Sequence, residues 1–595
     1  MKFKEINDAV ISDDGNWVLY NCQPGRGNGE VIVYNAESGK SFVIKQGYKP
    51  AITKDGKWAA AFIKPDALAL EKTNEKEKPK QALVLLETAN GKITTIERIK
   101  GFAFSDNSAW LVYQLLPDEE KTKEKTGEKI EKKDAKTDEI KKKSEWEKRS
   151  APLIMHNLAA GKTSRIENVI AFALDPASRC IAYSTYPCGE AASGIYTRNL
   201  NETDPPELLI TCGMKAVFNN LSWSKKKSRL AFLFHYDKAD EKKEGDKNLP
   251  GLWLWDGMTR KLKPLVTKND IPAGWMLPAE NKFTWTEDEE RLFFGFKPLD
   301  EYKFYKKSEP KDDEAEAKIE EKELYSSDYL LKKTGVDVWH WSDPQINPQQ
   351  KKNWDRDKKR LYLAVFHLGK NRFVRLADKE MPRLRPAENA RYVLGFSQVP
   401  YMRETTWDGT YQDVYLVDLG KGDRQKILSH HGQDVELSPQ GKFTAYYNDK
   451  HWFLYDNRTR QTRHLTAAIA APFYDEDHDY PEAVPGYGIA GWLANDRALL
   501  IYDKYDIWRF STASGQAQNI TAGQGRAGKI VFRIIKTDPE QKFFAGDQEC
   551  LLSAYSDEQK YTCFYGLRLG TPGVNLSISG EKKFRFVKKA KNADK

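Results

Sequence analysis

Short apolar runs, rich in aromatic and β-branched residues, alternate along the chain with polar turns. The stretch SDDGNW at Ser12 precedes the run WVLYNC, and near copies stand at Thr53 (TKDGKW), Ser105 (SDNSAW) and Ser438 (SPQGKF). A polar side chain can bond the amides of a tight turn, and Gly tolerates the positive φ that such a turn requires. The apolar runs are only four to seven residues long, which favours strands over helices. Each copy therefore predicts a β-hairpin.

The hairpin signal recurs through the whole chain. It stands at Ser12, Thr53, Ser105, Leu174, Ser224, Thr286, Ala387, Ser438 and Leu493, with a less regular copy at Thr537. A second pattern of strand, polar turn and strand follows at a variable distance, as in IVYNAESGKSFVI and VLLETANGKITTI. The two patterns together give a four-stranded antiparallel unit, and such a unit repeated along a chain is typical of a β-propeller.

We therefore predict an all-β fold, a β-propeller of seven to nine four-stranded antiparallel blades over residues 1–595. Folds built on βα units are not favoured, because strong helical periodicity is missing outside the charged segments. The 16 Trp, 28 Tyr and 27 Phe supply large rings to pack between sheets. Single propellers usually have about four to eight blades, so ten hairpin signals imply that some units are irregular or that blades lie outside this chain.

Three strongly charged segments interrupt the repeat, at about residues 118–149, 237–248 and 306–324. They contain too few apolar residues to offset the entropy of ordering them, so we interpret them as solvated loop insertions. Docking to a partner is the alternative interpretation. Each segment follows the second strand of its unit, so we expect all three on one face and the tight turns on the other.

Composition excludes several classes of protein. The net charge of +9 is a small excess of 95 basic over 86 acidic residues, without the basic strip of a nucleic-acid-binding protein. No run of eighteen apolar residues is present, so we expect no membrane span. The first residues, MKFKEINDAV, lack the apolar region of a signal peptide.

The cysteines form no zinc or redox motif, because no CxxC spacing occurs among Cys22, Cys180, Cys188, Cys212, Cys550 and Cys563. Cys180 and Cys188 either bridge a hairpin or stay free and half-buried, and the sequence leaves both possibilities open.

Two glycine-containing stretches resemble phosphate-binding loops, and we predict ordinary turns for both. AAGKTSR at Ala159 lacks the upstream Gly of a P-loop and aligns with the turn ESGKS at Glu37. PGRGNGE at Pro24 is not followed by a helix whose N-terminus could face a pyrophosphate.

Candidate metal ligands are also weak. Asp475, Asp477 and Asp479 have the spacing of the first ligands in an EF-hand loop, but Tyr480 and Gly486 occupy the places of its Gly and its bidentate Glu. We therefore predict a solvated acidic loop there. The adjacent His430 and His431 would face opposite ways on a strand, and we interpret both as surface loop residues. The sequence thus predicts no catalytic, cofactor-binding or metal-binding residue in this chain.

Three stretches are distinctive enough to indicate a family. VDVWHWSDPQINPQQ (336–350), YGIAGWLANDRALLIYDKYDIWRF (487–510) and NITAGQGRAGKIVFRII (519–535) resemble the N-terminal propeller of prolyl oligopeptidase family serine peptidases of the type common in Bacteroidetes. The resemblance begins at about Ile6 and covers nearly the whole chain.

The resemblance implies a catalytic α/β-hydrolase domain after the propeller, with its Ser on a G-x-S-x-G elbow followed by Asp and His. This sequence departs from the family there, because no G-x-S-x-G occurs in its 595 residues. We therefore expect a fragment whose hydrolase domain lies beyond residue 595. The dipeptidyl-peptidase branch also uses a Glu pair in its propeller, but the pairs at Glu119, Glu289 and Glu320 have no matching motif.

The expected function is accordingly non-catalytic. By resemblance, the propeller gates and positions peptide substrates for the downstream hydrolase domain, and the parent peptidase is periplasmic or secreted. We expect the chain alone to be inactive and to need no cofactor. The alternative is a stand-alone TolB-like scaffold that binds a protein partner, and fold alone does not separate the two. Oligomeric state, blade number and peptide preference are open at this point.

Overall fold

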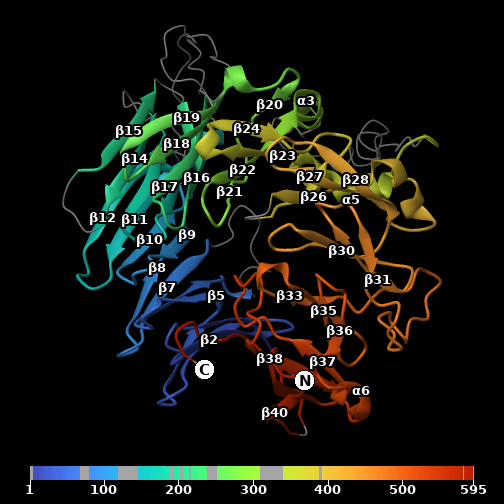
Figure 1. Ribbon diagram of the computed structural model, residues 1–595. Coiled ribbons are helices and arrows are strands. Elements are labelled where there is room, and N and C mark those ends of the chain that lie inside the picture. Colours follow the sequence, from blue (N-terminus) through green and yellow to red (C-terminus); the bar gives the residue numbers. More distant parts are fainter. Residues whose placement is uncertain are drawn as a thin grey trace, which may run out of the picture. The chain divides into compact units, whose positions relative to one another are not determined.

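The computed structural model describes residues 4–67, 80–117, 145–186, 193–200, 205–212, 216–236, 251–307, 340–387, 391–580 and 582–593 (Figure 1). These residues form nine antiparallel sheets, seven of them four-stranded, one five-stranded and one seven-stranded. Contacts divide the chain into two compact units. Unit 1 is Met1–Asn269 with Phe586–Lys595, and unit 2 is Asp270–Arg585.

Unit 1 contains four of the sheets. The first two are β1 (Lys4–Ile11), β2 (Trp17–Pro24), β3 (Glu30–Asn35) and β4 (Ser41–Lys45), then β5 (Gly47–Ile52), β6 (Trp58–Ile63), β7 (Ala82–Glu87) and β8 (Ile93–Ile96). The seven-stranded sheet is β9 (Ile99–Phe104), β10 (Trp110–Leu115), β11 (Ala151–Asn157), β12 (Thr163–Leu174), β13 (Cys180–Thr185), β14 (Ser193–Asn199) and β15 (Glu207–Cys212). The last is β16 (Ala216–Trp223), β17 (Arg229–Tyr236), β18 (Gly251–Asp256) and β19 (Lys261–Thr267). Helix α2 (Glu145–Arg149) precedes β11.

Unit 2 contains the other five sheets. The five-stranded sheet is β20 (Trp275–Met276), β21 (Thr284–Trp285), β22 (Arg291–Pro298), β23 (Tyr362–His367) and β24 (Arg372–Arg375). Two four-stranded sheets follow, β25 (Arg383–Arg385), β26 (Tyr392–Ser397), β27 (Gln412–Asp418) and β28 (Arg424–His431), then β29 (Val435–Leu437), β30 (Phe443–Asn448), β31 (His451–Asp456) and β32 (Thr462–His464). The last two are β33 (Ile489–Trp492), β34 (Ala498–Tyr502), β35 (Ile507–Ser511) and β36 (Ala517–Asn519), then β37 (Ile530–Ile534), β38 (Glu549–Ser556), β39 (Thr562–Arg568) and β40 (Val574–Ile578).

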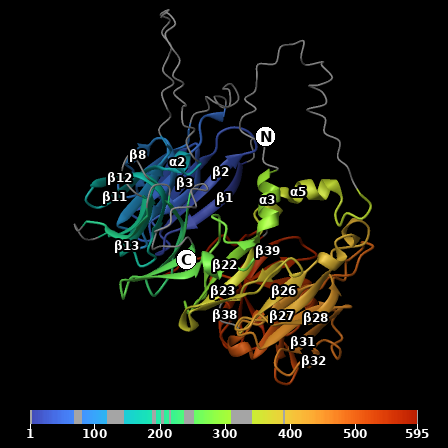
Figure 2. The same cartoon turned by 90° about the horizontal axis from the view of Figure 1, so that it is seen from above.

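The helices of unit 2 are α3 (Leu299–Lys307), α5 (Asn347–Lys358) and α6 (Gln524–Gly528). Figure 2 shows α3 beside α5, and the ring of Tyr305 on α3 meets that of Trp354 on α5 edge to face, with the centroids 4.9 Å apart. Short 3₁₀ turns span η2 (Lys268–Asp270), η3 (Leu368–Lys370), η4 (Val399–Tyr401), η5 (Glu404–Thr406) and η6 (Ala494–Asp496).

The sheets confirm the predicted all-β fold and its repeat. All ten hairpin signals lie between two paired strands, from β1 and β2 at the first to β37 and β38 at the last. The second pattern also forms hairpins, such as β3 with β4 and β7 with β8. The ten predicted four-stranded repeats form nine sheets, because the seven-stranded sheet contains two of them. Nine is the upper limit of the seven to nine blades expected.

Strand β12 joins the two repeats of the seven-stranded sheet. Its first half pairs with β11 as an outer strand, and its second half pairs with β13 as an inner strand. The change of partner falls at Val169, which is opposite both Ala151 and Thr185. Twelve residues are enough for both roles, so the chain continues from one blade to the next without a break.

The turn motif repeats because its hydroxyl closes the turn. At Ser12 the side-chain oxygen accepts the amide of Trp17 (3.0 Å), and at Thr53 it accepts that of Trp58 (3.0 Å). The Gly at the fourth position has a φ of 74° at Gly15, which a residue with a Cβ rarely adopts. The buried hydroxyl therefore gives a turn amide a fixed hydrogen-bond acceptor within the motif itself.

Successive turns also bond to one another. Ser108 stands where the first two copies have Gly, at a φ of 61°, and its Oγ accepts the amide of Asp55 from the preceding copy (3.2 Å). Ser178 repeats this contact, since its Oγ accepts the amide of Asn107 (3.0 Å). The Ser at this position offsets its backbone strain with a bond between blades.

The hydrophobic cores lie between consecutive sheets of each unit. In unit 1, Val31 and Val33 of the first sheet pack with Ala59 and Val84 of the second. In unit 2, Leu500 and Ile507 pack against Leu552 of the last sheet. The aromatic content predicted to fill such layers does so, with rings such as Phe218 and Phe234 stacked at 5.0 Å.

The charged segments lie largely outside the described residues, so the prediction of solvated loops stays a prediction. The strands before them are described: the segments follow β10, β17 and β22, each the second strand of its predicted repeat, and the face on which the segments lie stays a prediction. The end of the first segment forms α2, and the start of the third overlaps the end of α3.

Candidate functional site

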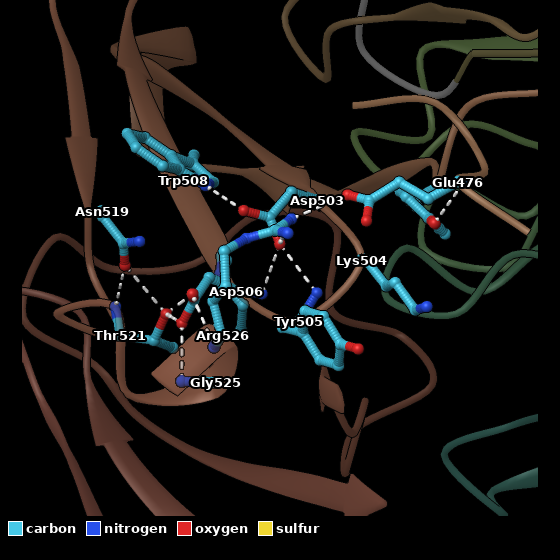
Figure 3. Close-up of polar contacts among 12 residues, drawn as sticks. Glu476, Asp503, Lys504, Tyr505, Asp506, Trp508, Asn519, Thr521, Gly525 and Arg526 are labelled. Atoms are coloured by element: carbon cyan, nitrogen blue, oxygen red, sulfur yellow. Dashed lines mark hydrogen bonds and ion pairs between the residues drawn. The ribbon is translucent and has the colours of Figure 1, made fainter. Parts of the chain in front are cut away.

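A buried polar cluster lies at one edge of unit 2, where β34 turns into β35 (Figure 3). The turn is the sequence DKYD, Asp503 to Asp506, and the connection from β36 through α6 to β37 packs against it. This edge carries the loops between second and third strands and the crossings between sheets. We call the group of Asp503, Asp506, Thr521, Gly525 and Arg526 the carboxylate clasp.

Asp503 closes the turn. Its Oδ1 accepts the amides of Tyr505 and Asp506, both at 2.7 Å, and its Oδ2 accepts the indole N–H of Trp508 at 2.8 Å. The residue is only 1% exposed, and a buried carboxylate is tolerated only when donors surround it. An Asp at the start of a turn supplies this geometry locally, because its short side chain reaches the amides two and three residues on.

Asp506 fastens the turn to the next sheet. Its Oδ1 accepts the hydroxyl of Thr521 at 2.6 Å and the amide of Gly525 at 2.9 Å, and its Oδ2 accepts the amide of Arg526 at 3.1 Å. Gly525 is required here, since an added Cβ would lie 2.7 Å from the carbonyl oxygen of Tyr505. One carboxylate thus holds the crossing from β36 to β37.

Charged side chains form the outer rim of the clasp. Arg526 donates to Glu476 at 2.9 Å, lies 3.7 Å from the nearest Asp503 oxygen, and covers the ring of Tyr505 at 5.2 Å. Lys504 pairs with Asp477 at 2.9 Å, and this hydrogen bond raises the pKa of the Lys504 ammonium above its usual value. The rim connects the loop before β33 to the clasp.

The contacts of the clasp are those of a structural joint. Both oxygens of the Asp506 carboxylate accept from donors whose positions the crossing fixes, the Thr521 hydroxyl and the amides of Gly525 and Arg526. Elsewhere, Ser342 contacts Nδ1 of His340, while Asp343 accepts the backbone amide of His340 at 3.0 Å. A catalytic triad needs one ring nitrogen on the Ser and the other on the acid, so this contact is a local turn.

The acidic loop predicted at Asp475, Asp477 and Asp479 does not gather as a calcium site. Asp475 accepts the amide of Asp477 at 3.1 Å, and the Asp477 carboxylate is turned to Lys504. Among the described residues no group of three or more His, Cys, Asp or Glu side chains is placed to hold a metal.

The prediction that His430 and His431 are both surface loop residues is wrong for His431. Both end strand β28, and their side chains do face opposite ways. His430 stacks on Tyr411 at 3.9 Å and pairs with Glu404, whereas His431 is 4% exposed and meets Tyr446 edge to face. Burial lowers the pKa of His431 below the usual value for imidazole.

The remaining weak motifs are ordinary turns, as predicted. AAGKTSR forms the turn between β11 and β12, and PGRGNGE follows β2. Cys180 carries a free, half-buried thiol, whose pKa burial raises to about 12, and Cys188 lies outside the described residues. In the part of the chain that the structure describes, no helix is long and apolar enough to cross a membrane.

A pocket of about 580 Å³ lies at the other edge of unit 2, among the tight turns of two neighbouring sheets. It is lined by Glu290, Arg291, His367, Gly369, Lys370, Arg372, Arg391, Asp418, Leu419, Gly420 and Lys421. Sequence reasoning missed this pocket. The available signal was the basic turn GKNR at Gly369 followed by GKGDR at Gly420, in the third-to-fourth-strand turns of consecutive sheets.

No protein-family model and no curated protein matches the chain. Solved structures similar to it include a eukaryotic initiation factor, at 12% identity and a TM-score of 0.36, over 78% of this chain and 88% of that one. A prolyl endopeptidase matches at 11% identity and a TM-score of 0.32, over 76% of this chain and 55% of that one. The β-propeller domain of the trilobed protease from Pyrococcus furiosus matches at 10% identity and a TM-score of 0.27, over 72% and 99%.

At 10–12% identity and TM-scores below 0.5, these likenesses do not define a family or a function. The chain spans about half the length of the prolyl endopeptidase, so that enzyme's activity is not carried over with the match.

Proposed function

We propose that this chain is the non-catalytic propeller region of a prolyl oligopeptidase family serine peptidase, in which it gates and positions peptide substrates for a hydrolase domain encoded downstream of residue 595. In this proposal residues 1–595 act as one propeller, with the charged segments as loop insertions. The parent enzyme is periplasmic or secreted, and its chemistry is acyl transfer through a Ser acyl-enzyme supplied by the hydrolase domain.

One observation carries the proposal: two of the three stretches on which the resemblance rests, 487–510 and 519–535, fold as consecutive blade elements. Residues 487–510 form β33 to β35, and residues 519–535 form the crossing and β37. They also supply the clasp residues Asp503, Asp506, Thr521, Gly525 and Arg526. The residues that make the sequence distinctive therefore fix the edge at which second and third strands connect, and loops at such an edge are where a scaffold presents binding groups.

The first experiment determines the reading frame beyond the codon for Lys595. The proposal expects an α/β-hydrolase domain with a G-x-S-x-G elbow. A stop codon in the intact genomic locus, with no hydrolase encoded beside it, would overturn the proposal and favour a scaffold that binds a protein partner.

The second experiment separates gating from catalysis. The peptidase with and without residues 1–595 is compared on a short fluorogenic peptide and on a folded protein containing the same cleavage site. Gating predicts that removal of the propeller abolishes discrimination against the folded substrate while the active-site Ser still reacts with a fluorophosphonate. Unchanged discrimination would contradict the gating role.

A third measurement concerns the chain by itself. The 595-residue protein is expected to take no fluorophosphonate label and to hydrolyse no peptide. In the described residues a hydroxyl meets an imidazole at Ser342 with His340 and at Thr466 with His451, and neither ring has an acid on its other nitrogen to complete a triad. Labelling of one Ser that disappears when that Ser is replaced by Ala would show that the chain is itself an enzyme.

A further inference from the structure

The basic pocket of unit 2 is formed by four turns. The turn between β21 and β22 contributes Glu290 and Arg291, and the turn between β23 and β24 contributes the segment from His367 to Arg372. Arg391 precedes β26, and residues 418–421 form the turn after β27. Turns of two consecutive sheets therefore surround one cavity. These turns join first to second and third to fourth strands, whereas the clasp lies where a second strand connects to a third.

Backbone bonds hold the pocket in shape. His367 donates its Nε2 proton to the carbonyl oxygen of Leu419 at 2.8 Å, which joins the two sheets. Arg372 donates to the carbonyl oxygen of Gly420 at 2.7 Å, and the amide of Leu368 donates to that of Glu290 at 2.9 Å. The cavity is thus organised before any ligand arrives, which lowers the entropic cost of binding.

The charge of the lining is unbalanced. Among the described residues that line the pocket, five are cations, Arg291, Lys370, Arg372, Arg391 and Lys421, and two are carboxylates, Glu290 and Asp418. Arg291 is also paired with Asp288, at 3.0 Å.

Asp418 is already committed within the turn. Its Oδ1 accepts the amides of Gly420 at 2.8 Å and Lys421 at 3.1 Å, and its Oδ2 accepts from Arg391 at 3.2 Å. Lys370 and Lys421 have no ion-pair partner among the described residues. The exposed ammonium groups of Lys370 and Lys421 are therefore available to an anion that enters the pocket.

The pKa of the His367 imidazole is also affected by the cations of the pocket. Burial lowers the pKa of His367, and the neighbouring Arg291, Lys370 and Arg372 lower it further against the opposing effect of the bond to Leu419. The charged groups that face the ring are thus mostly cations, and the ring is neutral at pH 7.

The lining also limits the kind of anion. Among the described residues of the lining, Leu419 is the one large apolar side chain, and none is Phe, Tyr or Trp. A nucleobase or an RNA strand needs an aromatic face for stacking, so neither matches this surface. The volume lies within the range of roughly 300–1,000 Å³ that is usual for small-molecule pockets. Arg and Lys around one cavity match the oxygens of a compact ion such as a diphosphate.

We propose that the pocket between the turns of β21 to β24 and β25 to β28 binds a compact multivalent oxyanion, with Lys370, Lys421 and Arg372 as its main contacts. This inference is independent of the peptidase proposal, because it concerns the other edge of the sheets and makes no use of a hydrolase domain.

The test measures pyrophosphate binding to the full chain by isothermal titration calorimetry in low salt. The double variant Lys370→Gln/Lys421→Gln is compared with Lys352→Gln/Lys359→Gln, which removes the same charge from exposed positions on and just after α5. We expect one saturable site in the unchanged protein, about tenfold weaker binding in the pocket variant, and binding within about twofold in the control variant.

Three outcomes overturn the proposal: absence of saturable binding, equal losses in both variants, or unchanged binding in the pocket variant. Equal losses would mean that pyrophosphate responds only to net charge. A melting curve of each variant without ligand checks that a weaker affinity does not reflect unfolding.

Discussion

The carboxylate clasp and the basic pocket lie in the same unit and use charge in opposite ways. In the clasp, Asp503 and Asp506 are each 1% exposed, and backbone amides, a hydroxyl and an indole surround them. In the pocket, Lys370, Arg372, Arg391 and Lys421 are exposed, and the Arg391 side chain is 73% exposed even though it pairs with Asp418. A buried carboxylate whose oxygens all accept hydrogen bonds fixes the segments that supply the donors. An exposed cation without a partner contributes little stability and stays available to a ligand.

The largest expected effect is in the clasp. Asp506→Ala leaves the hydroxyl of Thr521 and the amides of Gly525 and Arg526 without their acceptor, and we expect a loss of about 3–5 kcal/mol in the free energy of unfolding. Chemical denaturation followed by Trp fluorescence measures it. Asp479→Ala, at an exposed position in the acidic loop, is the matched control and should change the free energy by less than about 0.5 kcal/mol. Equal effects would mean that the clasp stabilises the fold no more than an exposed acidic position does.

A smaller effect in the clasp is expected from Thr521→Val. The shape is nearly kept, but the hydroxyl that donates to Asp506 is lost and two other donors to that carboxylate remain. We expect a loss of about 1–2 kcal/mol in the same denaturation experiment. Thr521→Ser, which keeps the hydroxyl, should recover most of it, and failure to do so would assign the loss to packing of the methyl group.

The next effect is the pH dependence of stability that is due to His367, a residue of the pocket. The folded-state pKa of His367 is lowered, so below the unfolded pKa of about 6.5 the unfolded chain binds the proton more readily than the folded chain. Its contribution to stability is therefore present above about pH 6.5 and is lost as pH falls towards the folded pKa. Melting temperatures of the protein and of His367→Gln between pH 8 and pH 5 should show a shallower fall in the variant. Parallel curves would contradict this assignment.

The smallest effect on stability is expected where the proposed binding effect is largest. Lys370→Gln/Lys421→Gln removes two exposed cations from a cationic surface, so the free energy of unfolding should stay within about 0.5 kcal/mol of the unchanged protein. Denaturation curves check this directly. A clear loss would mean that these side chains are part of the structure and would make the pocket resemble the clasp.

The sequence predicts the hairpins well because each one is fixed locally. Ser12 bonds to Trp17 five residues on, so the motif contains both partners and repeats as a unit. Strand β12 was not predicted as a shared strand, because its double pairing depends on partners at Ala151 and Thr185, on either side of it in the chain.

The two sites were harder to predict because their contacts are not local. Asp506 reaches Gly525 across nineteen residues, and Arg391 and Arg291 line one pocket from different sheets. His431 was misplaced for a related reason, since its burial is set by Tyr446 on the next sheet rather than by its polar neighbours. The stretch that contains Asp503 was nevertheless recognised as distinctive, and the structure supplies the physical reason.

The last described residues return to unit 1, where the amide of Asn592 donates to the carbonyl oxygen of Asp13 at 2.8 Å. Unit 2 is therefore a continuous piece of chain inserted into unit 1, which is itself discontinuous in sequence. The chain connects the two units at two junctions, near residues 269 and 585, so a protease that cuts one junction leaves them covalently joined. For recombinant work, unit 2 can be written as a single open reading frame, whereas unit 1 combines residues 1–269 with residues 586–595, which are separated in the sequence.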